Sequence, residues 1–348
     1  GDVIVGAYDY DNGQTGEGRA YVYHGSAGGL ATGAAWTAES DQASAFFGVS
    51  VATGGDVNGD GYGDVVVGAY GFDNGQSGEG RAYAYLGSAS GLATGPTWTA
   101  EGDQTNAGFG ESVAPAGDVN GDGYGDLIVG APFLGSFGRA FLYLGSSSGI
   151  ATSAAWTADG HDFMGDFGSS VATAGDVNGD GYADVIVGEP NADSFLGGSK
   201  VTGQAHVHLG SASGLSLSAA WSVEGDTEGA LLGSSVGTAG DVNADGYSDV
   251  VVGATHFGPG EAYLYLGSSS GLATTPAWTV SANQSSYLGF SVGTAGDVNG
   301  DGYSDVLVGA YAHDNGETDE GAAFLYLGSA SGPSTTAAWT AEGNQASA

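Results

Sequence analysis

Five copies of an acidic loop, each followed directly by an apolar run, constrain this chain more than any other feature. The first copy reads GDVNGDGYGDVVVGAY over residues 55–70. The loops begin at Asp56, Asp118, Asp176, Asp241 and Asp297, so successive copies are separated by 62, 58, 65 and 56 residues. A repeat of this length indicates one array of similar supersecondary units rather than several unrelated domains.

Each repeat carries four segments of strand length. In one unit these are residues 47–56, 64–70, 80–88 and 96–102, separated by Gly, Ser, Asp and Asn. The chain has 69 glycines and 18 tyrosines, which favours short strands joined by tight turns. The second segment is uninterrupted by polar residues, as in a strand covered on both faces. Four such strands at this period predict an all-β fold, a β-propeller of four-stranded antiparallel blades.

Residues 1–348 are predicted to form a single propeller domain in which six blades can be counted. The first lacks its first strand and its acidic loop, so we expect that strand after Ala348 or from a second molecule, which would allow self-association through the incomplete blade. Seven blades are possible in the intact protein. The approximate blades are residues 1–45, 46–106, 107–165, 166–230, 231–287 and 288–348.

The acidic loop has the ligand pattern of a calcium site. Oxygen side chains stand at loop positions 1, 3, 5 and 9, a glycine at position 6 permits the sharp turn, and the backbone carbonyl of position 7 adds a donor. Magnesium requires tighter octahedral geometry, and zinc prefers His or Cys, which the loops lack. The position expected to hold Glu in a helix-flanked calcium hand is Val67 in the first loop.

An ordinary Asp/Asn/Gly turn is the simple alternative for one loop, but five complete copies favour Ca²⁺ in five sites. The predicted ligands, with the tyrosines contributing backbone carbonyls, are Asp56, Asn58, Asp60, Tyr62, Asp64; Asp118, Asn120, Asp122, Tyr124, Asp126; Asp176, Asn178, Asp180, Tyr182, Asp184; Asp241, Asn243, Asp245, Tyr247, Asp249; and Asp297, Asn299, Asp301, Tyr303, Asp305.

The charge of the chain excludes several partners. Forty acidic residues against four basic ones give a formal charge of -36, which opposes binding to nucleic acid or anionic lipid and calls for bound counter-ions. The sequence has no apolar run long enough to predict membrane insertion. Cysteine is absent, so neither disulfides nor thiolate metal sites stabilise the fold.

Three motifs together resemble FG-GAP repeats: FG at residues 47–48, the nine-residue DVNGDGYGD loop, and VGAP at residues 129–132 or VGAY elsewhere. Such repeats build the β-propeller of integrin α subunits and of similar bacterial and fungal surface or lectin-like proteins. The resemblance covers nearly the whole chain. It implies calcium at the end carrying the first-to-second strand loops, ligand binding at the opposite end, and commonly seven blades.

Three related loops, at residues 9–18, 71–80 and 312–321, offer a second acidic motif on the end opposite the calcium loops. They are predicted either to form a second cation site or a rim for a partner, or to be solvated turns. Their acidic residues are Asp11, Asp73, Asp314, Glu17, Glu79 and Glu320. The longer loop at residues 191–204 carries the only lysine and is a candidate for a unique function.

The remaining polar and aromatic candidates have structural interpretations. His206 and His208 could share a metal, but they replace the packing aromatics of other blades, such as Tyr83 and Tyr85. The six tryptophans could stack on sugars, yet their fixed place in the fourth segment favours a structural role. The sequence shows no nucleophile elbow and no local Ser/His/Asp signature, so the chain itself is not expected to be an enzyme.

The sequence therefore predicts an extracellular or cell-surface calcium-binding propeller that recognises a protein or glycan as an adhesion module. Millimolar extracellular calcium fills even modest sites. One alternative is a structural subunit of a surface layer or filament, with strands donated between subunits. A third is a non-catalytic propeller attached to an enzyme.

Overall fold

The computed structural model describes residues 1–193, 200–255 and 258–346. Within these ranges the regular secondary structure consists of β-strands. The chain divides into two compact units. Unit 1 comprises Gly1–Asp118, Asp122–Gly160 and Asp166–Ser169, and unit 2 comprises Val119–Gly121, His161–Gly165 and Ser170–Ala348. The described residues contain no helix that is long enough and apolar enough to cross a membrane.

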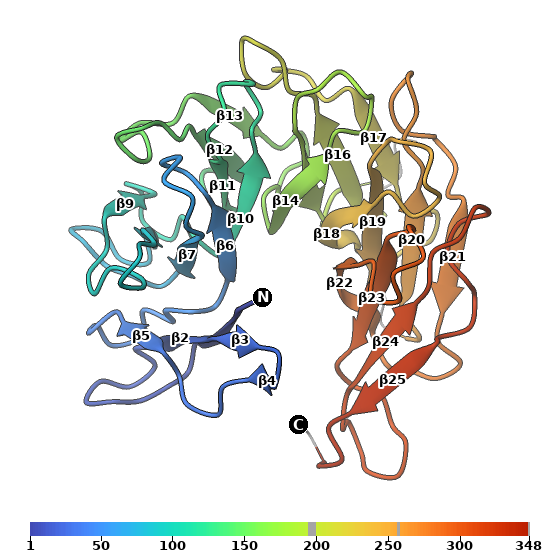
Figure 1. The fold of residues 1–348 in the computed structure, drawn as a ribbon, viewed down its shortest axis with the longest axis horizontal. Helices are drawn as coiled ribbons and strands as arrows, with labels where there is room; N and C mark the ends of the chain where they lie inside the picture. Colours follow the sequence, from blue (N-terminus) through green and yellow to red (C-terminus); the bar gives the residue numbers. More distant parts are fainter. Residues whose placement is uncertain (194–199, 256–257, 347–348) are drawn as a thin grey trace. The chain divides into compact units, whose positions relative to one another are not determined.

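Unit 1 contains three antiparallel sheets and a short ribbon (Figure 1). The first sheet has the order β1-β2-β5, and the other two have the orders β6-β7-β8-β9 and β10-β11-β12-β13. The strands are β1 (Val3–Ala7), β2 (Arg19–Tyr23), β3 (Gly25–Ser26), β4 (Gly29–Leu30), β5 (Trp36–Glu39), β6 (Val51–Gly55), β7 (Asp64–Ala69), β8 (Arg81–Tyr85), β9 (Trp98–Glu101), β10 (Ser112–Gly117), β11 (Asp126–Ala131), β12 (Arg139–Tyr143) and β13 (Trp156–Asp159).

Unit 2 contains three four-stranded antiparallel sheets among its described residues, each in simple meander order. The strands are β14 (Ser170–Gly175), β15 (Asp184–Glu189), β16 (Gln204–His208), β17 (Trp221–Glu224), β18 (Leu232–Gly240), β19 (Asp249–Ala254), β20 (Glu261–Tyr265), β21 (Trp278–Ser281), β22 (Leu288–Gly296), β23 (Asp305–Ala310), β24 (Ala322–Tyr326) and β25 (Trp339–Glu342).

The sheets are the blades of a β-propeller, as the repeat predicted. Within unit 1, β6 lies beside both β1 and β10, and within unit 2, β18 lies beside both β14 and β22 (Figure 1). The prediction that the first blade lacks its first strand is confirmed, because its sheet contains only β1, β2 and β5 among the described residues. The seventh blade and the single-domain organisation remain predictions.

The apolar run after each acidic loop forms the second strand of its blade. Every residue of β7 is buried, and the same holds for β11, β15 and β19. Neighbouring strands pair with both edges, and side chains cover both faces of the strand, so only an uninterrupted apolar sequence suits it.

Two glycines and one aromatic residue of the repeat form the joint between successive blades. Gly68, in the VGAY motif, lies so close to Gly110 of the next blade that an added Cβ would stand 1.8 Å from the Gly110 carbonyl oxygen. Phe109, beside Gly110, is completely buried and forms a parallel bridge with Gly80. The glycines of the FG and GAP motifs are therefore needed because the backbones of successive blades approach each other too closely for a Cβ.

Tryptophans of the fourth strand form a second joint, which supports their structural interpretation. The Trp98 indole Nε1 donates to the Ala151 carbonyl at 2.9 Å, and its ring packs edge-on against Tyr143 at 4.9 Å. Trp36, Trp221 and Trp278 make the same pair of contacts to the blade that follows them. These rings are therefore engaged within the fold rather than displayed for sugar stacking.

Candidate metal centre

Each acidic loop joins the first strand of a blade to the second. In the first loop the chain leaves β6 at a bulge, where pairing shifts between Thr53 and Gly55. Gly55 has φ of 77°, a conformation that favours glycine. The loop then returns at Asp64, the first residue of β7.

The position 9 aspartate fixes the loop to the rest of its blade. Asp64 is 2% exposed; its Oδ2 accepts from the Val57 backbone N–H at 2.9 Å and its Oδ1 from the Gly87 N–H at 2.7 Å. One carboxylate thus joins the start of the loop to Gly87, which lies two residues after the end of β8. Asp184, Asp249 and Asp305 make the same two bonds in unit 2.

The side chains at positions 1, 3 and 5 turn inward onto the loop backbone. Asp56 accepts from the Asp60 N–H at 3.0 Å and from the Gly61 N–H at 2.8 Å, and Asp60 accepts from the Tyr62 N–H at 3.0 Å. Asn58 Nδ2 donates to Asp60 Oδ2 at 3.0 Å. The loops that begin at Asp176, Asp241 and Asp297 repeat this pattern.

Part of the loop that begins at Asp118 lies in each unit. Within unit 1, Asp118 accepts from the Asp122 N–H at 3.0 Å and from the Gly123 N–H at 2.8 Å, as Asp56 does in its own loop. Asp126 Oδ1 accepts from the Gly145 N–H at 2.9 Å. These contacts give the same loop frame.

The position 9 carboxylate has a raised pKa in several loops. Burial, and then the charges of Asp180 and Asp176, together raise the pKa of Asp184 to about 6, although its two backbone hydrogen bonds lower it. Asp249 has a pKa of about 6 for the same reasons. A divalent cation would relieve this repulsion. Carboxylate, amide and carbonyl oxygens within one turn are a donor set that fits calcium.

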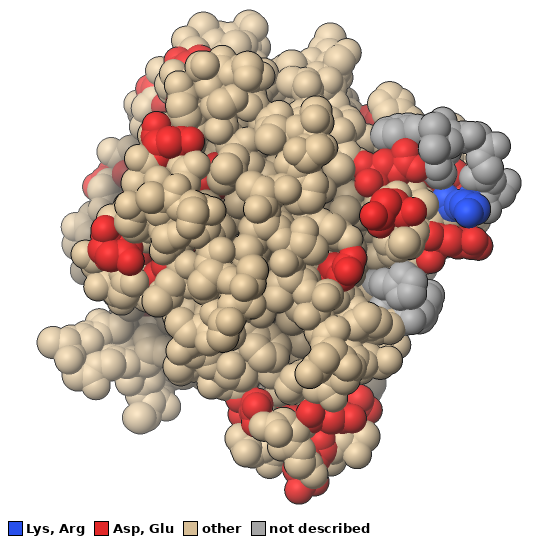
Figure 2. All heavy atoms as spheres, turned by 90° about the vertical axis from the view of Figure 1, so that its right-hand side faces the viewer, with Lys and Arg blue, Asp and Glu red and all other residues tan. Residues whose placement is uncertain are grey.

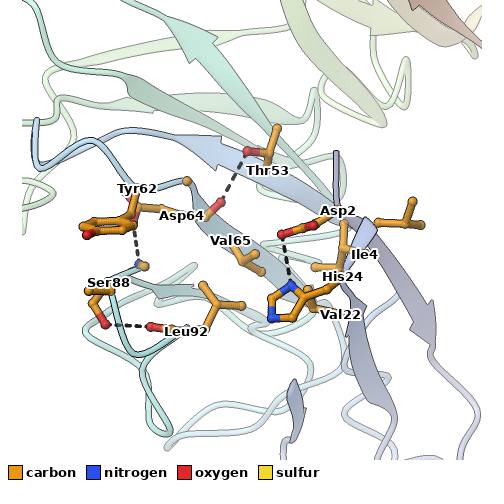
Figure 3. Close-up of a pocket in the computed structure, with 15 residues that line it drawn as sticks. Asp2, Ile4, Val22, His24, Thr53, Tyr62, Asp64, Val65, Ser88 and Leu92 are labelled. Atoms are coloured by element: carbon orange, nitrogen blue, oxygen red, sulfur yellow. Dashed lines mark hydrogen bonds and ion pairs between the residues drawn. The ribbon is translucent and has the colours of Figure 1, made fainter. Parts of the chain in front are cut away.

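The position 7 tyrosine also connects successive loops through its ring. A Cβ added at Gly59 would meet the Tyr124 ring at 2.8 Å, and one added at Gly121 would meet Tyr182 at the same distance. Among the described residues no acidic loop precedes that of Tyr62, and Tyr62 is 43% exposed. It lines a cavity of about 530 Å³ in unit 1, opposite the paired side chains of Asp2 and His24 (Figure 3).

The predicted ligands thus all lie in the loops between first and second strands, one set for each of five blades. The structure brings the residues of each set together within one loop. Whether these residues bind an ion stays a prediction, since the loop geometry establishes the donors alone.

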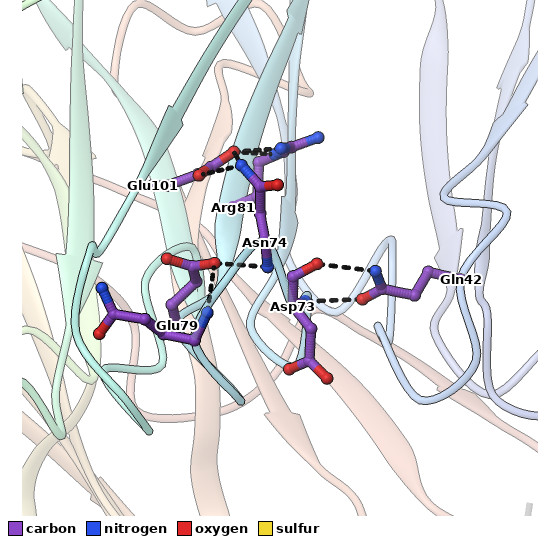
Figure 4. Close-up of polar contacts among 7 residues, drawn as sticks. Gln42, Asp73, Asn74, Glu79, Arg81 and Glu101 are labelled. Atoms are coloured by element: carbon purple, nitrogen blue, oxygen red, sulfur yellow. Dashed lines mark hydrogen bonds and ion pairs between the residues drawn. The ribbon is translucent and has the colours of Figure 1, made fainter.

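The second acidic motif lies at the opposite end of the blades and is organised by amide side chains. In unit 1, Asn74 Nδ2 donates to Glu101 at 2.9 Å and Gln76 Nε2 donates to the Asp103 carbonyl at 2.7 Å. Gln42 of the preceding blade exchanges two hydrogen bonds with the backbone of Asp73 (Figure 4). This end therefore combines second-to-third strand loops with the segments that follow fourth strands.

Sequence reasoning missed the contribution of Gln42. The available signal was its recurrence: Gln104 and Gln284 also follow an acidic or Asn residue after a fourth strand and bond to the next blade's loop.

The solvated-turn interpretation of this motif is correct for only half of its acids. Asp11, Asp73 and Asp314 are exposed, whereas Glu17, Glu79 and Glu320 are at most 2% exposed. Among the described residues, two groups of acidic side chains place one oxygen from each member within 4.8 Å of the others. These groups are Glu17, Glu39, Asp41 and Glu79, Glu101, Asp103.

His206 and His208 are buried, as expected for positions that replace packing aromatics, but their surroundings are polar. His206 lies between Ser222 and Glu189, at 2.9 and 3.2 Å. His208 Nδ1 lies 2.9 Å from the Ser216 carbonyl, and burial lowers the pKa of its ring to about 4.

The candidate loop at residues 191–204 can be assessed only in part, because residues 194–199 lie outside the described residues. Lys200 is exposed. On the face shown in Figure 2, acidic side chains gather in separate groups and basic side chains are scarce, in line with the net charge.

Comparison with known proteins matches four stretches of the chain to repeat families. The FG-GAP repeat matches residues 47–85, 109–143 and 167–208, and the FG-GAP-like repeat matches residues 241–308. Integrin alpha-V of Gallus gallus is 34% identical over 236 residues, which cover 63% of this chain and 21% of the relative. Integrin alpha-IIb of Mus musculus is 35% identical over 190 residues, covering 51% and 18%. The chain thus spans about a fifth of the length of these relatives.

Among solved structures, rhamnogalacturonan lyase YesW aligns with a TM-score of 0.45 and 13% identity, covering 93% of this chain and 59% of the lyase.

Proposed function

We propose that this chain, which belongs to the FG-GAP repeat family of integrin α-like β-propellers, is a calcium-binding recognition module that acts outside the cell. The observation that carries the proposal is the repeated loop frame. In each loop, inward-turned oxygens at positions 1, 3 and 5 stand beside a buried position 9 carboxylate fixed by backbone N–H groups.

Calcium in these loops would serve the fold first. Each loop packs like-charged side chains into one turn, and the whole chain carries a formal charge of -36. Bound divalent ions offset both repulsions and hold the first and second strands together. Sites of modest affinity suffice where calcium is millimolar, roughly 10⁻³ M outside cells.

Ligand recognition is assigned to the end opposite the calcium loops. In unit 1 the loop between β11 and β12 displays Phe133 and Phe137, which are 48% and 42% exposed. Exposed aromatic side chains at a loop tip are costly in water and typical of interaction surfaces. The matched relatives are integrin α subunits, which supports a protein ligand, and a glycan is the second ligand class to test.

The experiment compares binding of the labelled chain to arrays of extracellular proteins and glycans, in about 2 mM calcium or in chelator. We expect calcium-dependent binding that falls at least about tenfold in a Phe133→Ser/Phe137→Ser double variant, because truncating central aromatic contacts removes at least about 1.4 kcal/mol of binding free energy. Leu217→Ser is the matched control, since Leu217 is 84% exposed but lies between β16 and β17 at the calcium-loop end. Binding that is the same in calcium and in chelator would contradict the proposal. An equal loss of binding in Leu217→Ser would contradict it as well.

One observation favours a second candidate, assembly by strand donation. Among the described residues, β1 is the edge strand of its sheet, and Val3 and Val5 are 40% and 44% exposed. An open apolar edge is a template for another strand. Light scattering over a concentration series checks this: a mass that stays monomeric at high concentration would eliminate assembly through β1.

A further inference from the structure

We number the blades in chain order. Blade 1 (β1, β2 and β5) carries a cluster of three carboxylates at the end of the blade away from the calcium loops. Glu17 comes from the loop between β1 and β2, Glu39 ends β5, and Asp41 follows two residues later. One oxygen from each lies within 4.8 Å of the other two. We refer to these three residues as the blade 1 carboxylate cluster.

Glu17 is the member that cannot be explained by the fold alone. It is 0% exposed, and neither of its carboxylate oxygens has a hydrogen-bond partner among the described residues. A buried carboxylate without a donor is costly, and its neighbours in the cluster are two further carboxylates. Among the described residues, Glu17 has neither a hydrogen-bond donor nor an ion pair.

Arg19 does not supply either of these. Its guanidinium pairs with Glu39 and lies over the Tyr10 ring at 4.2 Å. Asn12 Nδ2 donates to the other oxygen of Glu39 at 2.9 Å. One guanidinium therefore accompanies a cluster of three carboxyl groups, and it pairs with only one of them.

We propose that the blade 1 carboxylate cluster binds one divalent cation of the calcium class. Three carboxylate oxygens are hard donors, and calcium accepts six to eight oxygens, so backbone and water would complete the shell. The exposed Asp41 gives the ion a route from solvent. This site is separate from the acidic nonapeptide loops and does not depend on their occupancy.

Blade 2 shows what the same three positions look like when donors are present. Glu79, Glu101 and Asp103 form an equivalent cluster, but Glu79 accepts hydrogen bonds from the backbone N–H groups of Asn74 and Gln76 (Figure 4). Because this buried carboxylate is already hydrogen-bonded, the proposal is confined to blade 1.

Blade 6 supplies a matched control within the same chain. Glu320 is buried and accepts from the Asn315 N–H at 2.6 Å, and Asn315 Nδ2 donates to Glu342 at 2.9 Å. Asn344 occupies the position of Asp41, so the third carboxylate is absent. An Asn at this position is evidently compatible with the blade.

The test counts the calcium ions bound by the full chain, by equilibrium dialysis after chelator treatment and return to about 2 mM calcium. Glu17→Gln and Asp41→Asn should each bind one ion fewer than the wild type, whereas Glu320→Gln should bind the same number. Circular dichroism verifies folding, and Asp41→Asn protects the test against a folding failure because it copies the natural residue of blade 6.

An unchanged count in both Glu17→Gln and Asp41→Asn would overturn the proposal. The nonapeptide loops are intact in every variant, so the difference between variants reports on this cluster alone. A wild-type count of one that falls to zero would support this site while refuting calcium in the loops.

Discussion

Asp64 and its equivalents in the other loops each have two roles. As a hydrogen-bond acceptor it joins the loop to the third strand, and as the last carboxylate of the loop it stands near Asp56 and Asp60. The two roles are compatible because each carboxylate oxygen has more than one lone pair. The repeated sequence revealed the acid at this position, but not its burial.

Trp98 should be among the most stabilising single side chains of unit 1. Trp98→Ala is expected to lower the free energy of unfolding by about 3 to 5 kcal/mol, because it empties a buried ring site and removes the bond to Ala151. Trp98→Phe should cost less, since the ring is retained. Denaturant unfolding measures both, with Trp339→Ala as control because Trp339 is 52% exposed. Equal losses at Trp98 and Trp339 would contradict the blade-joint role.

Glu111 should make unit 1 less stable as pH rises. Burial, with the nearby Asp166 charge, raises the pKa of Glu111 to about 7. A carboxyl whose folded pKa is raised contributes stability that is present below its unfolded pKa and lost as pH rises through about 7. Glu111→Gln should therefore raise the melting temperature at about pH 8 and change it little near pH 4.5.

Thermal unfolding across this pH range checks the expectation. Glu228→Gln serves as control because Glu228 is exposed. A gain at Glu111 that is independent of pH would show that ionisation is not the cause.

At the scale of elements, the loop and its two strands form one hydrogen-bonded unit. The backbone N–H groups of Asp180 and Gly181 are held by Asp176, and the N–H of Val177 by Asp184. These backbone hydrogen bonds define the loop frame, and we expect bound calcium to stabilise it further. Metal binding is therefore expected to be coupled to the ordering of this frame.

Positions 5 and 9 of one loop should respond differently to neutralisation. In chelator, Asp184→Asn should lower the free energy of unfolding by about 1 to 3 kcal/mol, because an amide N–H₂ would face a buried backbone N–H. Asp180→Asn should remain close to wild type in chelator, since its side chain is exposed. In calcium, both variants should lose part of the calcium-dependent gain in stability.

Melting temperatures with and without calcium measure these effects. If Asp180→Asn were as unstable as Asp184→Asn in chelator, the separation between a bonding and a ligating carboxylate would be wrong.

The strands could be predicted from local sequence patterns, whereas the burial and the contacts of the second acidic motif depend on residues far apart in the chain. The four strands follow from alternation and apolar runs of about five residues, which depend on neighbours along the chain. Glu17 and Glu39 lie in one cluster although they are 22 positions apart, and the hydrogen bond from Asn12 to Glu39 spans 27 positions. No local sequence pattern indicates these contacts. The missing first strand was visible because the other blades supplied a template.

At the scale of the whole molecule, the formal charge of -36 and the repeated loops belong to one physical account. A chain this acidic resists compaction, and cations bound at fixed places offset that resistance where charges are most concentrated. The glycine and tryptophan joints then hold each blade against the next one within each unit.

The measurement that tests the central claim most directly is a crystal structure grown in calcium, with anomalous scattering recorded to locate the ions. We expect an anomalous peak in each of the five acidic loops, bounded by oxygens of positions 1, 3, 5, 7 and 9 at about 2.3 to 2.6 Å. Loops that show no anomalous peak at millimolar calcium would contradict the account.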